Sequence, residues 1–112
     1  MIKKNVTISG KEYTLGMSAL LPKIYRAKYG RDLIADMGKL SMSVQGQEVE
    51  NKEALLENIV WESLIHGGSE VGESMDEWLM DIDSPLAMYE LLPTILEMWT
   101  ANNKVTSVPR KK

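Results

Sequence analysis

The stretch NVTISGKEYTLG, residues 5–16, decides the fold of the N-terminal part of the chain. Its apolar residues alternate with polar ones on both sides of a polar segment, 9–12, that contains Gly10; they are Val6, Ile8, Tyr13 and Leu15. Such alternation places the apolar side chains on one face, and a glycine allows the positive φ angle of a tight turn. The stretch predicts a β-hairpin. A hairpin alone is marginal in water, so its apolar face must pack on the helices that follow.

The next segments carry the apolar spacing of helices. Ser18 is a plausible N-cap for a helix that runs to Tyr29, and Gly30 is suited to end it. A short second helix is expected over residues 33–40. Residues 41–51 are compatible with a surface loop or a second small hairpin, and the sequence does not choose between them.

Two further helices are expected in the middle of the chain. Asn51 is placed to cap a helix with a broad apolar face, which Gly67-Gly68 should end. Ser74 and Glu77 then have the spacing of a capping box, which predicts a short helix.

The last predicted helix begins at Ser84-Pro85, with Ser as N-cap and Pro at the first helical position. Its apolar residues follow a helical stripe, namely Met88, Leu91, Leu92, Ile95, Leu96 and Trp99. Pro93 should kink or split this helix, which we expect to fray near Asn102-Asn103. The fold class expected is α+β, mainly α, with an N-terminal β-hairpin packed on a bundle of about four to five helices.

Size and composition favour one soluble domain. The chain has 112 residues, 44% of them hydrophobic and 26% charged, which is an ordinary globular composition. We expect a domain over 1–104 and a flexible basic tail over 105–112. A net charge of −3 argues against a nucleic-acid partner, and no apolar run is long enough for a membrane span.

Few residues are suited to catalysis or metal binding. There is no cysteine, and His66 is the single histidine. Nothing in the sequence marks a nucleophile for it, and a position near a helix end favours a structural role. Asp81 and Asp83 resemble the start of a calcium loop, but its glycine and distal glutamate are missing. We therefore expect no enzyme, no cofactor and no metal site.

Binding is the remaining role. The 8 methionines fit either an irregular core or a groove for variable partners. Of the 3 tryptophans, Trp61 and Trp99 are expected to be mostly buried, and Trp78 to lie at an interface. The candidate partner-binding residues are Met75, Trp78, Leu79, Met88 and Trp99.

The order of these elements resembles a known family. The segments are VTISGKEYTLGM (6–17), KYGRDL (28–33), LLENIVWESLIHGG (55–68), DEWLMDID (76–83) and LPTILEMWTANNK (92–104). Each is a loose pattern, but their order and total length are similar to those of the tail assembly chaperones of long-tailed phages that infect Gram-positive bacteria.

The resemblance implies a non-enzymatic protein with a mainly helical fold. Such chaperones coat the tape measure protein, keep it soluble and help recruit tail tube subunits, and neighbouring copies are expected to associate. The resemblance also implies a location in the host cytoplasm during assembly and absence from the mature virion. Replacing Trp78 or Met75 by Ala should then weaken binding and leave the fold intact. The alternative is a phage head–tail connector or another small α+β adaptor.

Overall fold

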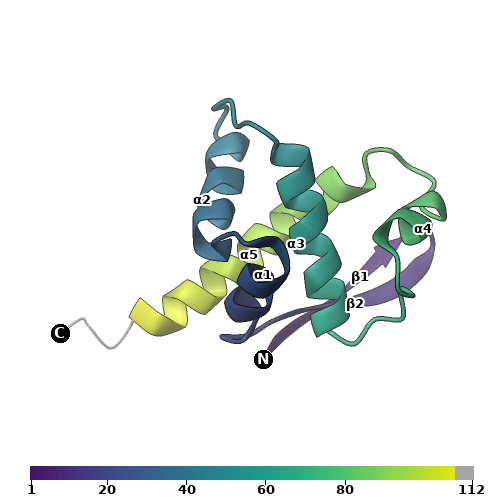
Figure 1. Cartoon of the computed structure of the whole chain (residues 1–112), viewed down its shortest axis with the longest axis horizontal. Coiled ribbons are helices and arrows are strands. Elements are labelled where there is room, and N and C mark those ends of the chain that lie inside the picture. Colours follow the sequence, from purple (N-terminus) through teal and green to yellow (C-terminus); the bar gives the residue numbers. More distant parts are fainter. Residues whose placement is uncertain (108–112) are drawn as a thin grey trace.

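The computed structural model describes residues 1–107, so most of the predicted tail, residues 108–112, lies outside it. In chain order the elements are β1 (Ile2–Ile8), β2 (Lys11–Met17), α1 (Leu21–Tyr29), α2 (Leu33–Val44), α3 (Lys52–His66), α4 (Met75–Met80) and α5 (Ala87–Ser107). The predicted α+β class, mainly α with an N-terminal hairpin, is confirmed (Figure 1).

The predicted hairpin has a tighter turn than the sequence indicated. Ser9 and Gly10 alone form the turn, both with positive φ angles of 52° and 78°, and Ile8 pairs with Lys11 across it. Two positive φ angles give the type of turn whose twist matches that of the strands. The apolar residues of the hairpin share one face, as predicted, and this face is covered by α3 and α5.

Helix α3 is the centre of the fold. It packs against β2, α1, α2 and α5, and Figure 1 shows it between α1 and α2 on one side and the hairpin on the other. The contact with β2 is close because no side chain separates the two backbones: Gly67, which follows α3, lies against Gly16. A Cβ atom on Gly67 would lie 2.9 Å from the Gly16 nitrogen and closer still to the Thr14 carbonyl oxygen.

Gly67→Ala should therefore destabilise the fold, by about 2 kcal/mol, because the obstructing atoms are backbone and cannot turn aside. The φ angle of Gly67 is −79°, so alanine is excluded by space and not by conformation. Gly38→Ala is the matched control: Gly38 lies within α2 with open space around it, and alanine there should stabilise by about 0.5–1 kcal/mol. Chemical denaturation measures both, and equal effects of the two changes would contradict this packing.

Several helix ends match the sequence signals and others do not. Gly30 ends α1 in the left-handed conformation, and the Ser74 hydroxyl accepts from the Glu77 N–H at the start of α4. Ser18 acts from two residues before the helix cap, where its hydroxyl accepts from Leu20. Asn51 precedes α3 in a left-handed conformation and its side chain caps nothing, so that prediction was wrong.

The longer helices exceed their predicted bounds. Helix α2 continues to Val44. Residues 41–51, for which the sequence left a loop and a second hairpin open, therefore form the end of this helix and a loop after it. Helix α5 begins at Ala87, because Ser84 and the residues after it form a turn in which the Ser84 hydroxyl accepts from Leu86. It then runs through the exposed Pro93 as one element and continues to Ser107, beyond the predicted fraying point.

Two buried carboxylates fasten α1 to its neighbours. Asp36 of α2 accepts from the Tyr25 hydroxyl at 2.8 Å and from Arg31 at 2.8 and 2.9 Å. Glu62 of α3 accepts from the Tyr29 hydroxyl at 2.8 Å and pairs with Lys28 at 2.7 Å. Burial and the neighbouring carboxylates raise the pKa of both tyrosines well above the usual range, so both hydroxyls stay protonated as donors.

Candidate binding site at the hairpin tip

The five predicted partner-binding residues do not form one exposed surface. Trp78 is only 5% exposed and Met88 8%, so neither side chain is open on the surface, and a role for them in partner binding stays a prediction. Met75, Leu79 and Trp99 are partly buried and pack against the core. Met88 and Trp99 are eleven residues apart on α5, about 16 Å along the helix.

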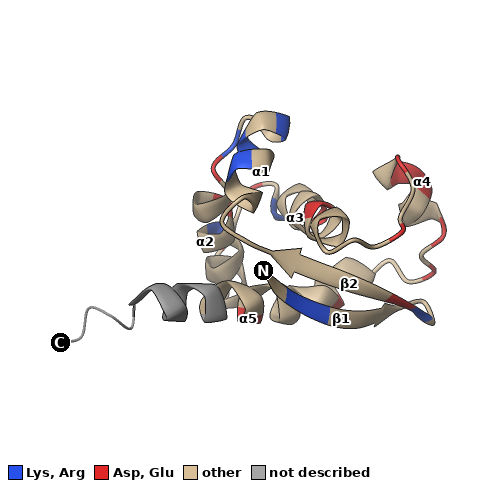
Figure 2. Ribbon diagram, turned by 90° about the horizontal axis from the view of Figure 1, so that it is seen from below, with Lys and Arg blue, Asp and Glu red and all other residues tan. Residues whose placement is uncertain are grey.

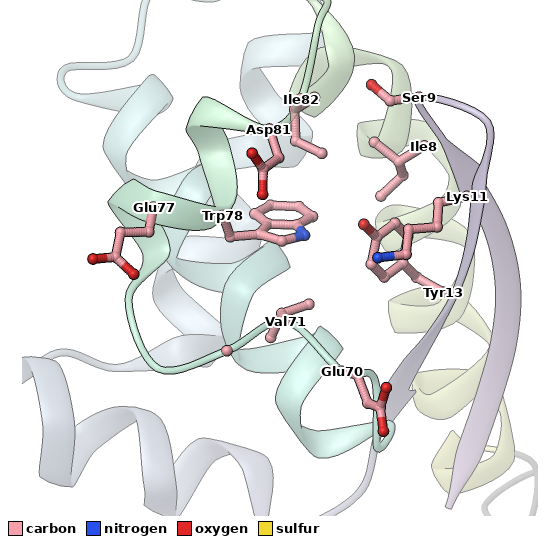
Figure 3. Close-up of a pocket in the computed structure, with 11 residues that line it drawn as sticks. Ile8, Ser9, Lys11, Tyr13, Glu70, Val71, Glu77, Trp78, Asp81 and Ile82 are labelled. Atoms are coloured by element: carbon pink, nitrogen blue, oxygen red, sulfur yellow. The ribbon is translucent and has the colours of Figure 1, made fainter.

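Trp78 is buried because the hairpin and α3 converge on it. Its ring meets Tyr13 of β2 edge to face, with centroids 5.8 Å apart, and lies 5.9 Å from Trp61 of α3. Its indole nitrogen is buried and has no hydrogen-bond partner among the described residues. Figure 3 shows this nitrogen on the side of the ring that faces β2. Trp61 is buried, as predicted.

A cavity of about 330 Å³ lies between α4 and the hairpin (Figure 3). Its apolar part is formed by Ile8, Tyr13, Val71, Trp78 and Ile82. Its polar lining residues are Ser9, Lys11, Glu70, Glu77 and Asp81. We call it the α4 cavity.

A second cavity, of about 420 Å³, lies between β1 and the start of α5, and we call it the β1 groove. Both cavities share Ile8 and Ser9 at the hairpin tip. The segment that joins α4 to α5, residues 81–86, contributes to both and is held to the tip by a hydrogen bond of 3.0 Å from the Asp83 N–H to the Ser9 hydroxyl. We call this segment the α4–α5 link.

The most exposed large apolar side chains in this region lie at the two ends of the α4–α5 link, Met80 just before it and Leu86 as its last residue. Met80 is 85% exposed and Leu86 is 61% exposed. Neither residue belongs to the predicted set. Met80 follows the apolar residues of α4 and Leu86 precedes the apolar stripe of α5, so the sequence did not mark either side chain as exposed. Which way each side chain points depends on where α4 ends and where α5 begins.

Charge is segregated in the same region. The sequence contains no Lys or Arg between Lys52 and Lys104, whereas residues 70–83 alone contain six acidic residues. Figure 2 shows acidic residues around α4 and basic ones on α1. A partner segment with apolar and cationic side chains would match this surface in both respects.

The structure brings a serine to the single histidine. The Ser18 hydroxyl lies 2.7 Å from Nε2 of His66, a pairing that the sequence did not indicate because 48 positions separate the residues. The same hydroxyl accepts from the Leu20 N–H, and the N–H groups of Gly67 and Gly68 are bonded to carbonyls of α3. Neither the α4 cavity nor the β1 groove includes the pair. The contact joins the segment before α1 to the last residue of α3.

The described part of the chain has no cluster of three or more His, Cys, Asp or Glu side chains arranged to hold a metal ion. Nor does it include a helix that combines the length and the apolar character needed to cross a membrane.

Comparisons with models of protein families, with curated proteins and with solved structures gave no match. The resemblance to phage tail assembly chaperones therefore stays a prediction from the sequence.

Proposed function

We propose that the protein is a non-enzymatic phage tail assembly chaperone that binds the tape measure protein and keeps it soluble. In this proposal copies of the chain associate along the client and help recruit tail tube subunits. The protein acts in the host cytoplasm and is absent from the mature virion. The family resemblance supplies the identity of the partners, and the surface at the hairpin tip supports the binding role.

The observation that carries the proposal is the exposure of Met80 and Leu86 at the two ends of the α4–α5 link. Exposed apolar side chains beside cavities are typical of surfaces that bind another polypeptide. Methionine suits a client whose sequence varies along its length, because its flexible side chain adapts to different partners. A long amphipathic helix would place its apolar stripe against these two residues.

The acidic residues of the α4 cavity indicate that the proposed client carries basic side chains near its apolar stripe. Glu70, Glu77 and Asp81 are among the residues that line the α4 cavity, and Lys11 is the only basic one. Lys or Arg residues beside the apolar stripe of the client would lie near these carboxylates. Because such pairs are solvent-exposed, they would speed association and make binding weaker at high salt.

Replacing Met80 and Leu86 together by Glu should weaken client binding at least tenfold, because the change places two carboxylates on an acidic surface at the expense of apolar contact. The measurement is the soluble fraction of the tape measure protein of the same phage when it is co-expressed with each variant. Since both side chains are exposed, the unfolding transition of the double variant should match that of the parent.

Ile34→Glu is the matched control, since Ile34 is 57% exposed on α2 and does not line either cavity. It should solubilise the client as well as the parent does. Equal solubilisation by the Met80/Leu86 variant would show that the client does not bind here.

A further inference from the structure

The hairpin has one covered edge and one free edge. On β2, the Thr14 N–H and C=O groups are both bonded to the Ser69 hydroxyl, at 2.8 and 2.7 Å, so they point away from β1. Gly16, two residues on, lies against Gly67 on the same side. The loop after α3 thus covers the outer edge of β2.

The opposite edge, on β1, is open. Thr14 is opposite Asn5, and because the Thr14 groups point outward, the N–H and C=O groups of Asn5 point outward from the other strand. Alternation extends this to Lys3 and Thr7. Among the described groups, no hydrogen bond reaches the outward backbone groups of these three residues, and the sheet that the structure describes contains only β1 and β2.

The free edge is complementary to itself. If a second β1 pairs with it antiparallel about Asn5, then Asn5 is opposite Asn5, and Lys3 is opposite Thr7 of the second copy. In this register the outward-pointing groups of both strands meet as hydrogen-bonded pairs. No lysine is directly opposite a lysine, so the repulsion that such a charged edge normally creates is avoided.

The side chains agree with the same register. On the apolar face Ile2 of the second copy would lie opposite Ile8, beside the β1 groove, whose apolar lining includes Val6, Ala87 and Leu91. Lys4 of the second copy would lie opposite Val6, and Glu90 lines the same groove as a carboxylate for it. By symmetry each contact occurs twice.

We propose that two copies of the chain pair through β1 about Asn5 to form a four-stranded antiparallel sheet. The contact uses the same surface on both copies, so it closes at two. It names an interface for the self-association proposed above, but it does not depend on the client. The Met80/Leu86 variant should remain a dimer, so failure of one proposal can be told from failure of the other.

Single cysteines test the register, because the natural chain has none. In a hydrogen-bonded pair the two Cα atoms are about 5.5 Å apart, within the range that a disulfide spans. Asn5→Cys should therefore give a covalent dimer on mild oxidation. Thr7→Cys is the matched control on the same face of the strand: its two copies would be about 13 Å apart and should stay monomeric on a denaturing gel.

A mixture of Lys3→Cys and Thr7→Cys chains should form a mixed disulfide dimer, since these residues are opposite each other in the proposed register. No cross-link in Asn5→Cys, or equal cross-linking of Asn5→Cys and Thr7→Cys, would overturn the proposal.

A proline variant tests the backbone hydrogen bonds. Asn5→Pro removes an outward N–H that β2 does not use, so the hairpin can keep its ladder. The dimer dissociation constant, measured by analytical ultracentrifugation, should rise about tenfold or more, because each copy loses one bond across the interface. Asn5→Ala keeps the N–H and should dimerise like the parent. An unchanged constant in a folded Asn5→Pro variant would contradict β1 pairing.

Discussion

Trp78→Ala should lower the free energy of unfolding by about 3–5 kcal/mol, the usual cost of removing a buried aromatic side chain. The burial of Trp78 thus replaces the expectation from the sequence that this variant leaves the fold intact. Trp78 joins three parts of the fold, because it contacts Tyr13 of β2 and Trp61 of α3 from its own position on α4. Loss of the ring would leave a cavity between them and release α4. For a chain of this size the midpoint of thermal unfolding should fall by more than about 12 °C.

Trp78→Phe is the control for this prediction. It keeps an aromatic ring between Tyr13 and Trp61 and deletes an indole N–H that has no partner among the described residues. An unpaired buried donor is itself costly, so its removal offsets part of the lost contact, and the net loss should be about 1 kcal/mol. If Trp78→Ala unfolds at the same temperature as the parent, the packing described for α4 is wrong.

Asp36→Ala should destabilise the protein by about 3 kcal/mol. The carboxylate is 1% exposed and is the acceptor for both Tyr25 and Arg31, so its removal leaves the Tyr25 hydroxyl buried without that partner. Removing one member of a buried ion pair commonly costs about 3–5 kcal/mol. Because Arg31 is partly exposed and water can solvate it, we expect a loss of stability at the lower end of this range. Urea denaturation of the parent and the variant measures the difference.

The same site gives a pH dependence. Burial alone would raise the pKa of Asp36, but the hydrogen bonds from Arg31 and Tyr25 favour the carboxylate more strongly and hold its pKa below the ordinary value of 3.8. A carboxyl whose pKa is lower in the folded state stabilises fully above its unfolded pKa, and this contribution is lost as the pH falls through its folded pKa.

The stability difference between the parent and Asp36→Asn should therefore be constant from pH 7 to about 5 and shrink below about pH 4. Measurement of both proteins across this range checks it. A difference that grows on acidification would contradict the assigned hydrogen bonds.

The sequence was sufficient for the elements whose signals are local. Alternation of Val6, Ile8, Tyr13 and Leu15 predicted the hairpin, and Gly30 and Ser74 correctly predicted a helix end and a helix start. These features depend on a few consecutive residues, so tertiary contacts had little to alter.

Tertiary packing overrode other local signals. Pro93 was expected to kink or split the last helix. The helix is not split: Pro93 lies on the exposed side of α5, and the buried Leu92 and Ile95 hold the helix on both sides of it. Asn51 was expected to cap α3, yet it adopts a left-handed conformation at the end of the loop from α2. The geometry of that loop depends on where α2 ends.

The candidate site shows the same limit more strongly. The sequence pointed to the region around α4 but chose Trp78 as the exposed residue, when Met80 on the same helix is the exposed one. A six-residue helix has too few positions for periodicity to separate its inner and outer faces. The sequence also did not indicate that the edge of β1 is free, because this depends on Ser69 covering the opposite edge of the sheet.

The most direct test of the proposed function is whether this chain forms a complex with the tape measure protein of the phage to which the proposal assigns it. The two are expressed together and separately, and the soluble fraction of the tape measure protein is measured, with the composition of any complex determined by native mass spectrometry. We expect the tape measure protein to be insoluble alone and soluble in a complex with many copies of this chain. A tape measure protein that stays insoluble in its presence, together with a stoichiometric copy of the chain in purified virions, would contradict the proposed function.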